Sequence, residues 1–235
     1  MNAIAQRLEA VRRRLRAAER QAGRAAGAVG LIAVGKTWPA EDLAQAYAQG
    51  QRDFGENYLQ EALAKQDALR GLDIVWHFIG PIQSNKTKPL AERFQWVHGV
   101  DRLKIAQRLS EQRPESLPPL HICLQVNVSG EASKAGVAPV DLPALAQAVA
   151  GLPRLRLRGL MAIPAAGEDF DAQRLAFRTL REAMQGLGMA GLDTLSMGMS
   201  DDLEAAVLEG ATWVRVGTAI FGERQKPGAA SPPAG

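Results

Sequence analysis

The chain alternates short apolar, β-rich runs with longer segments of helical periodicity, and this alternation continues almost to its end. Eight runs have the length and composition of buried strands. They are 31–34, 53–55, 76–79, 96–99, 122–128, 158–162, 194–197 and 213–216. Helical patterns between them include 40–49, 59–69, 102–111, 142–150, 170–187 and 201–209. Such alternation is typical of a parallel sheet that is covered by helices.

Eight regular units favour closure of the sheet into a single α/β domain, a (β/α)8 TIM barrel. A doubly wound open sheet uses the same alternation and is the structural alternative. No composition break divides the chain, so we expect one barrel domain over residues 1–225. Residues 226–235 are rich in Pro, Gly, Ala and Ser, and we expect a disordered tail there.

An extra amphipathic helix is expected before the first strand, with its arginines facing water. Its apolar side chains recur at steps of three or four: Ile4, Leu8, Val11, Leu15 and Ala18.

Composition excludes several classes of protein. The net charge of +3 and the lack of a basic run longer than 12–14 argue against nucleic-acid binding. No stretch approaches the roughly 20 apolar residues of a membrane span. Cys123 is the single cysteine, which excludes an intramolecular disulfide and a multi-cysteine metal site. The arginine-rich N-terminus lacks the apolar core of a secretion signal, so we expect a cytoplasmic protein.

Residues 30–37 match the phosphate-loop pattern G-x-x-x-x-G-K-[ST], but their context argues against nucleotide binding. The four middle residues are Leu, Ile, Ala and Val, which read as a buried strand rather than a turning loop. Pro39 lets a helix start only after Lys36, so the lysine lies at the carboxyl end of the strand.

Lys36 is either a loop residue on the surface or an amine held at the mouth of the barrel. The carboxyl ends of barrel strands build the active site, which favours the mouth. Partial shielding from water makes an amine easier to deprotonate, and a neutral amine attacks an aldehyde. Lys36 is therefore a candidate for Schiff-base chemistry.

The ends of the last two strands offer an anion cradle, the usual phosphate site of such barrels. Ser200 is predicted to cap the helix that follows strand seven, and its hydroxyl and the amides behind it could hold a phosphate. Gly217 allows a close backbone approach after strand eight, and the hydroxyl and amide of Thr218 can donate. Arg215 alternates with apolar neighbours, so its side chain faces away from theirs; the alternative is a surface arginine.

Seven motifs resemble those of the pyridoxal phosphate homeostasis protein family, whose fold is similar to the barrel of alanine racemase and other fold-type III pyridoxal phosphate (PLP) proteins. The likeness covers nearly the whole chain, although Gly35 and Trp38 stand where the family usually has a serine and often a basic residue. The motifs are 33–37, 54–58, 76–86, 133–136, 158–163, 196–203 and 214–222.

The resemblance implies that Lys36 carries PLP as a Schiff base. Ser200, Gly217 and Thr218 would hold the phosphate, and Arg215 would face the pyridine nitrogen. Asn57 would lie near the cofactor, although an asparagine after a strand is otherwise more often a helix cap. An arginine on the pyridine nitrogen keeps it unprotonated and weakens the cofactor as an electron sink.

The resemblance also implies a function in PLP homeostasis: supplying the cofactor and limiting free aldehyde. Alanine racemases add a β-domain with a second catalytic base, and only a short tail follows Gly222. We therefore expect a carrier rather than an enzyme, a monomer, and transient contacts with apo-enzymes that use PLP. The alternatives are a weak PLP-dependent racemase or lyase, and a barrel that binds another phosphate ligand.

Two further polar residues have ambiguous roles. Glu56 is either a base or a surface charge. His77, between two aromatic residues, is predicted to be a hydrogen-bonded core histidine, and the three histidines of the chain show no metal-ligand spacing. We expect no metal site.

Overall fold

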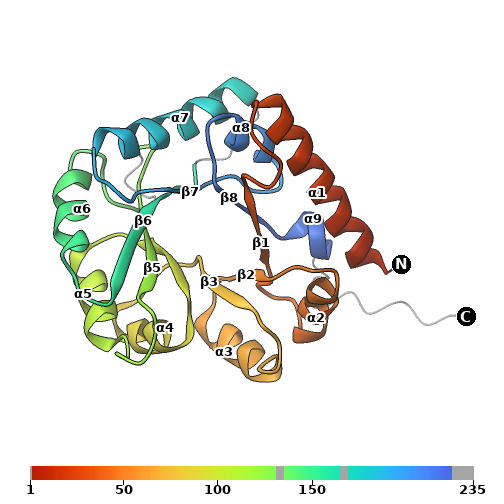
Figure 1. The fold of residues 1–235 in the computed structure, drawn as a ribbon, viewed down its shortest axis with the longest axis horizontal. Helices are drawn as coiled ribbons and strands as arrows, with labels where there is room; N and C mark the ends of the chain where they lie inside the picture. Colours follow the sequence, from red (N-terminus) through yellow and green to blue (C-terminus); the bar gives the residue numbers. More distant parts are fainter. Residues whose placement is uncertain (1, 131–134, 165–168, 224–235) are drawn as a thin grey trace, which may run out of the picture.

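The computed structural model describes residues 2–130, 135–164 and 169–223, and in them eight parallel strands form a closed barrel (Figure 1). Because β1 pairs with β8 as well as with β2, the predicted barrel is confirmed and the open sheet is excluded. The strands are β1 (Gly30–Val34), β2 (Asp53–Glu56), β3 (Val75–Phe78), β4 (Trp96–Val100), β5 (Leu120–Gln125), β6 (Leu155–Met161), β7 (Thr194–Ser196) and β8 (Trp213–Val216).

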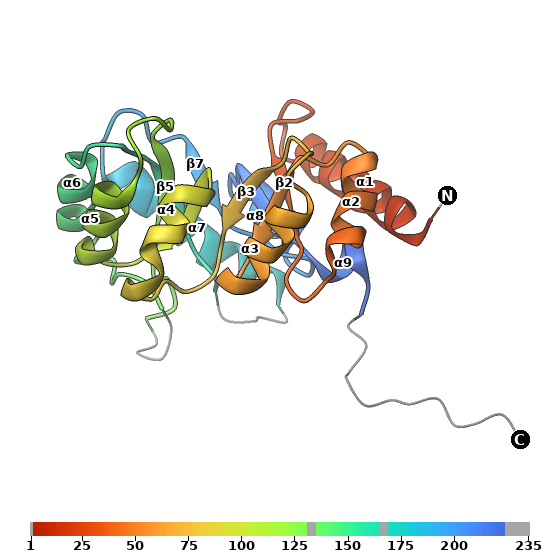
Figure 2. The ribbon, with the colours of Figure 1, turned by 90° about the horizontal axis from the view of Figure 1, so that it is seen from below.

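Helices surround the barrel, as Figures 1 and 2 show from two directions. They are α1 (Ala3–Gln21), α2 (Ala40–Ala48), α3 (Leu59–Ala68), α4 (Thr87–Arg93), α5 (Leu103–Gln112), α6 (Leu142–Ala150), α7 (Phe170–Gly186), α8 (Leu203–Leu208) and α9 (Thr218–Phe221), with a 3-10 turn η1 (Ser84–Lys86) before α4. The expected tail at 226–235 and the motif residues Ser133 and Lys134 lie outside the described residues.

The expected elements are present, but two strands have bounds that are shifted by more than one residue. β5 starts at Leu120 and ends at Gln125 rather than Val128, because the Asn127 side chain accepts the Gly130 amide (3.1 Å) and forms a turn. β6 starts three residues earlier than predicted, at Leu155. Arginines alternate with leucines at its start, and most of these side chains are only partly buried, so no continuous apolar run marks the first half of this strand.

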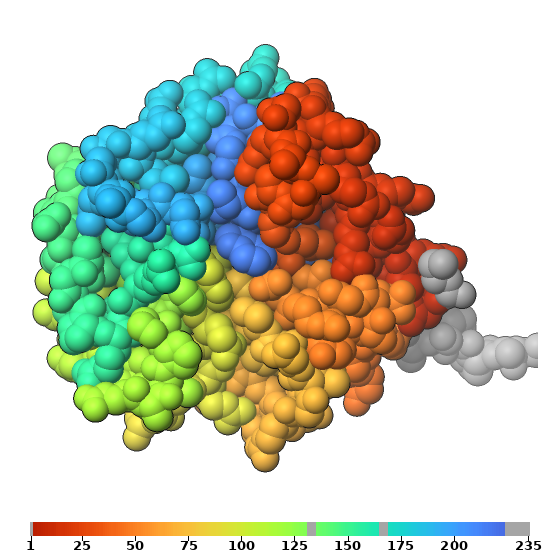
Figure 3. Space-filling model, viewed as in Figure 1, coloured from red at the N-terminus to blue at the C-terminus, as the bar shows by residue number. Residues whose placement is uncertain are grey.

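The predicted N-terminal helix is α1, and it packs against α8 and α9. Figure 3 shows its surface lying against the C-terminal part of the barrel. Not all of its arginines face water, which corrects the expectation from periodicity. Arg7 donates to the carbonyl of Phe221 (3.1 Å), and Arg14 bonds to Glu204 and to the carbonyl of Ser200. The helix therefore joins the first and last units of the barrel.

Aromatic rings and histidines fill part of the barrel interior, where branched aliphatic residues dominate in most barrels of this kind. His77 stacks on Trp96, with ring centroids 5.6 Å apart, and also contacts Trp213 and His98. Gly30 leaves room for the Trp213 ring, since a Cβ at this glycine would lie 2.3 Å from it. His77 is fully buried and hydrogen-bonded, as predicted.

Close strand packing at β6 generates a stability prediction. A Cβ on Gly159 would lie 1.9 Å from the backbone oxygen of Thr194 on β7, and backbone atoms there cannot move without breaking the ladder. Gly159→Ala is expected to lower the free energy of unfolding by about 2–3 kcal/mol or to prevent folding. Urea titration measures this, with Gly71→Ala as the control because no atom lies within 4 Å of its Cβ. Equal midpoints for the two variants would contradict the packing described here.

Candidate functional site

A cavity of about 510 Å3 lies at the carboxyl ends of β1, β2 and β8 and beside the turn after β7. This size is within the range of small-molecule sites. All six residues singled out in the sequence line it: Lys36, Asn57, Ser200, Arg215, Gly217 and Thr218. The other lining residues are Arg14, Val34, Trp38, Ile79, Ile163, Met199, Asp201 and Ala219.

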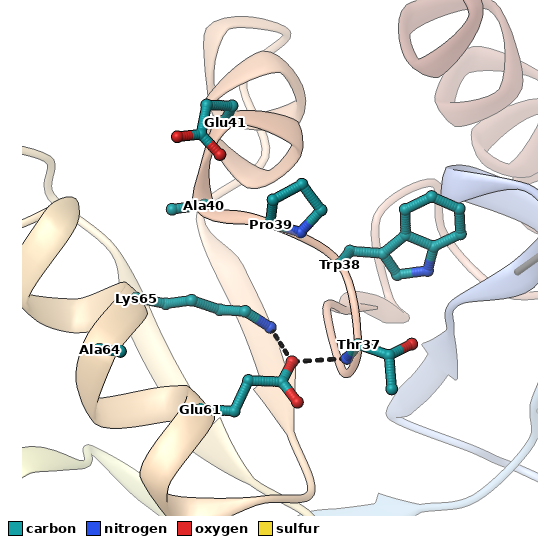
Figure 4. Close-up of a pocket in the computed structure, with 8 residues that line it drawn as sticks. All are labelled: Thr37, Trp38, Pro39, Ala40, Glu41, Glu61, Ala64 and Lys65. Carbon is teal, nitrogen blue, oxygen red and sulfur yellow. Dashed lines mark hydrogen bonds and ion pairs between the residues drawn. The ribbon is translucent and has the colours of Figure 1, made fainter. Parts of the chain in front are cut away.

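Lys36 lies in the turn that follows β1, and its side chain is partly buried. The next residue, Thr37, has a positive φ of 68°, so the chain bends sharply directly after the lysine. Glu61 and Lys65 of α3 hold this turn from the other side (Figure 4). Glu61 accepts the Thr37 amide, and Lys65 donates to the carbonyl of Gly35 (2.6 Å). The position of Lys36 therefore depends on α3 as well as on β1.

Glu56 is not the surface charge that the sequence left open, and it does not line the cavity. Its carboxyl group is fully buried below Gly35 and accepts a hydrogen bond from Lys65 at 2.8 Å. Lys65 also forms an ion pair with Glu61. Burial raises the pKa of Glu56 to about 7, an effect that the charge of Lys65 only partly offsets. These three side chains form a cluster next to the cavity, in which Glu56 and Lys65 are buried and Glu61 is partly exposed, and none of the three lines the cavity.

Asn57 follows β2 and is not the cap of α3, a position that Tyr58 occupies. Its Oδ1 is buried and makes no hydrogen bond with any described residue. An unpaired buried amide oxygen costs free energy, so this atom is suited to accept a donor from a ligand in the cavity.

Arg215 points into the barrel, which rules out the surface alternative. Its Nη1 donates to Ser196 Oγ and its Nη2 to the carbonyl of Ala162, both at 2.9 Å. Burial lowers the pKa of Arg215 to about 10, so the guanidinium keeps its charge at neutral pH. Two hydrogen bonds thus hold the charged guanidinium of Arg215 in place at the wall of the cavity.

Ser200, Gly217 and Thr218 lie together at one end of the cavity. The prediction that Ser200 caps α8 is wrong: the cap is Asp202, and α8 begins at Leu203. The carboxylate of Asp202 accepts the Met199 amide instead, which keeps the intervening residues out of the helix. Ser200 therefore faces the cavity from a turn.

Arg14 is a lining residue that the sequence analysis missed. It forms a two-pronged ion pair with Glu204 (2.9 Å to each oxygen) and donates to the carbonyl of Ser200 at 3.0 Å. The hydrogen bond to Glu204 raises the pKa of Arg14. Arg14 follows buried Val11 by three residues, which places it at the edge of the apolar face of α1. This spacing was the only signal in the sequence that could have found it.

Charge in the cavity favours an anion. Three cationic side chains, Arg14, Lys36 and Arg215, line it together with one carboxylate, Asp201. Within residues 2–130, 135–164 and 169–223, no group of three or more His, Cys, Asp or Glu could hold a metal ion. No helix in the same ranges is long and apolar enough to cross a membrane.

The sequence matches two sets of known proteins along nearly its full length. Residues 6–225 match the family described as alanine racemase, N-terminal domain. The chain is 66% identical to the pyridoxal phosphate homeostasis protein of Pseudomonas aeruginosa, over 95% of this chain and 97% of the relative. The chain belongs to the pyridoxal phosphate homeostasis protein family. The family's Escherichia coli K12 member is 51% identical over 95% of this chain and 98% of its own.

Solved structures agree with this family membership. PipY of Synechococcus elongatus PCC7942, solved with PLP bound, has a TM-score of 0.82 and 40% identity, covering 93% of this chain and 100% of PipY. Alanine racemase of Corynebacterium glutamicum has a TM-score of 0.62 and 19% identity, over 95% of this chain and 63% of the racemase. The racemase likeness shows a shared barrel fold for this member of the homeostasis protein family.

The raised pKa of Glu56 predicts how stability depends on pH. The native state holds the Glu56 proton more tightly than the unfolded chain, where the pKa is near its ordinary 4.5. Stability from this group is therefore complete below about pH 4.5 and is lost as pH rises towards 7, by roughly 1–3 kcal/mol. Urea unfolding at pH 5 and pH 8 tests this.

Glu56→Gln is expected to remove most of the loss of stability between pH 5 and pH 8, because the amide does not titrate. Glu115→Gln is the control, since the Glu115 side chain is 87% exposed. A fall that is the same in wild type and Glu56→Gln would contradict the raised pKa.

Proposed function

We propose that this chain binds PLP in the described cavity and serves PLP homeostasis, keeping the cofactor available and limiting free aldehyde. One observation carries the proposal: the amine of Lys36 shares a single cavity with the polar turn of Ser200, Gly217 and Thr218 and with the buried Arg215. PLP has an aldehyde, a phosphate and a ring nitrogen. These three groups need a lysine, an anion-binding turn and a further polar side chain, respectively.

The cavity fits PLP on three grounds. Its excess of cationic groups suits a phosphate. The unpartnered Oδ1 of Asn57 is available to a donor on the ligand. The amine of Lys36 lies in the cavity wall, where it can meet the aldehyde of a bound ligand.

Each proposed site residue has its own task. Lys36 would hold PLP by condensation of its amine with the aldehyde, with loss of one water, and PLP would supply an electron-accepting ring there. Ser200 and Thr218 donate hydrogen bonds to the phosphate, and Gly217 lets the backbone approach it. Arg215 donates to the pyridine nitrogen.

Arg215 also favours a carrier over an enzyme. A guanidinium has no acceptor and does not give up its proton at neutral pH, so it keeps the pyridine nitrogen unprotonated. An unprotonated ring stabilises carbanions poorly, which disfavours the alternative of a PLP-dependent racemase or lyase.

The relatives support the same proposal. The Pseudomonas aeruginosa protein is named a pyridoxal phosphate homeostasis protein, and PipY has been solved with PLP bound. We further propose that residues 1–225 act as one PLP-binding domain in a cytoplasmic monomer. Its expected partners are PLP and, transiently, apo-enzymes that need it.

A reducible adduct on Lys36 tests the cofactor and its anchor. We expect the protein incubated with PLP to show a Schiff-base band in the visible region. Borohydride reduction should then fix PLP on the peptide that contains Lys36, located by mass spectrometry. Lys36→Ala should lose both signals, whereas Lys88→Ala should keep them, because the Lys88 side chain is 70% exposed and does not line the cavity.

An adduct scattered over surface lysines, or no band at all, would contradict PLP binding and favour another phosphate ligand. The loaded protein also distinguishes a carrier from an enzyme. Substantial conversion of added amino acids that is lost in Lys36→Ala would overturn the carrier function, while leaving the cofactor and its anchor in place.

A further inference from the structure

A continuous chain of hydrogen bonds runs from the cavity through the barrel core. Arg215 Nη1 donates to Ser196 Oγ (2.9 Å), and Ser196 Oγ lies 2.8 Å from His98 Nδ1. His98 Nε2 lies 3.0 Å from His77 Nδ1, and His77 Nε2 lies 3.0 Å from Asp53 Oδ1. The chain therefore links the wall of the candidate PLP site to the first residue of β2 at the opposite end of the barrel.

The five residues come from five strands, β8, β7, β4, β3 and β2, so the chain crosses the interior rather than following the sheet. The side chains of Ser196, His98 and His77 are fully buried. Trp96 and Trp213 pack against His77, and Trp96 also lies beside His98. These rings keep water from the histidines.

The Asp53 end of the chain determines where each proton lies when both imidazoles are neutral. A carboxylate only accepts, so His77 donates to Asp53 from Nε2 and accepts at Nδ1. His98 then carries its hydrogen on Nε2 and donates to His77. Ser196 gives its hydroxyl hydrogen to Nδ1 of His98 and accepts from Arg215, because a guanidinium only donates.

Neutral imidazoles fit this arrangement, because each ring accepts at Nδ1 and donates from Nε2. Burial lowers the pKa of His77, and the hydrogen bond that His77 donates to Asp53 offsets this only in part. Burial, with the neighbouring His77 and Arg215, lowers the pKa of His98 well below its ordinary value. Both rings are therefore neutral at pH 7.

Arg215 needs this support because its charge is buried. It makes no ion pair with any other residue of the described ranges, although an isolated buried charge is expensive. Hydrogen bonds that all run in the same direction polarise and strengthen one another. In this chain they lead from the guanidinium of Arg215 to the carboxylate of Asp53. The chain offsets part of the cost of the charge and holds Nη1 in one direction.

We propose that His98 and His77 are positioning residues, which fix the orientation of Arg215 through a one-way chain of hydrogen bonds that ends on Asp53. That Arg215 then meets the pyridine nitrogen of PLP rests on the proposed function. The orientation of the chain itself does not, since it is a property of the protein without cofactor.

The first test uses the cofactor-free protein and nitrogen-15 NMR of its imidazoles at pH 7. Wild type is expected to show His77 and His98 as neutral rings with the hydrogen on Nε2. Asp53→Leu removes the final acceptor of the chain, so His77 no longer has to donate from Nε2. We therefore expect a tautomer change at His98, which lies two hydrogen bonds away from Asp53. His121 is the internal control, because it bonds to Arg158 and not to this chain.

A doubly protonated ring, or hydrogen on Nδ1 of either histidine in wild type, would overturn the proposal. So would Asp53→Leu leaving His98 unchanged. Neither outcome depends on PLP binding.

The second test uses the loaded protein. His98→Phe keeps a ring but breaks the chain, so the absorption band is expected to shift while the adduct on Lys36 still forms. His98→Gln carries a donor and an acceptor, so its band should return part of the way to that of the wild type.

If His98→Phe does not fold, Asp53→Leu serves instead, since the Asp53 side chain lies at the end of the barrel and is 26% exposed. An unshifted band in the chain-breaking variant would overturn the proposal, whereas a wild type without any adduct would overturn only the proposed function.

Discussion

Closure of β1 on β8 is the interaction on which the site depends. Backbone pairing sets Ile32 beside Arg215 and Ala33 beside Val216, and this register brings the ends of the first and last strands together. Gly217 tightens the contact further, because a Cβ there would lie 3.1 Å from the carbonyl of Val34. Without closure, Lys36 would be separated by the whole sheet from the turn that could hold a phosphate. The helix α1 reinforces the same joint through Arg14, which reaches from before β1 to the carbonyl of Ser200 after β7.

The interior exchanges ordinary apolar packing for oriented polar groups. A buried arginine and two buried histidines are costly unless every donor finds an acceptor. Here each bond of the chain from Arg215 to Asp53 has one possible direction, so stability and the orientation of the cavity wall have the same physical origin. A second buried cluster, Glu56 with Lys65 and Glu61, holds the Lys36 turn from outside the barrel. Arg215 and the turn that carries Lys36 are thus held by hydrogen-bond networks whose other members do not line the cavity.

The architecture and the positions of Lys36, Ser200, Gly217 and Thr218 at the barrel mouth followed from local sequence signals, whereas the roles of Asn57 and Arg215 rested on the family resemblance. Apolar runs and helical periods are local, so all eight strands could be predicted, and strand ends in a barrel necessarily converge. Bounds failed where the local signal was weak, as in the alternating start of β6. The role of Arg14 could not be predicted, since periodicity describes a helix face but not its partner. The Ser200 cap failed because Asp202 competes for the same turn, and the pairing of Glu56 with Lys65 depends on how α3 packs against β2.

A crystal structure of the protein with PLP would test the central claim most directly. We expect continuous density between Lys36 and the cofactor. We also expect the phosphate beside Ser200, Gly217 and Thr218, and the pyridine nitrogen within hydrogen-bond distance of Arg215. Cofactor bound away from this cavity, or in it but reversed so that the phosphate meets Arg215, would contradict the account.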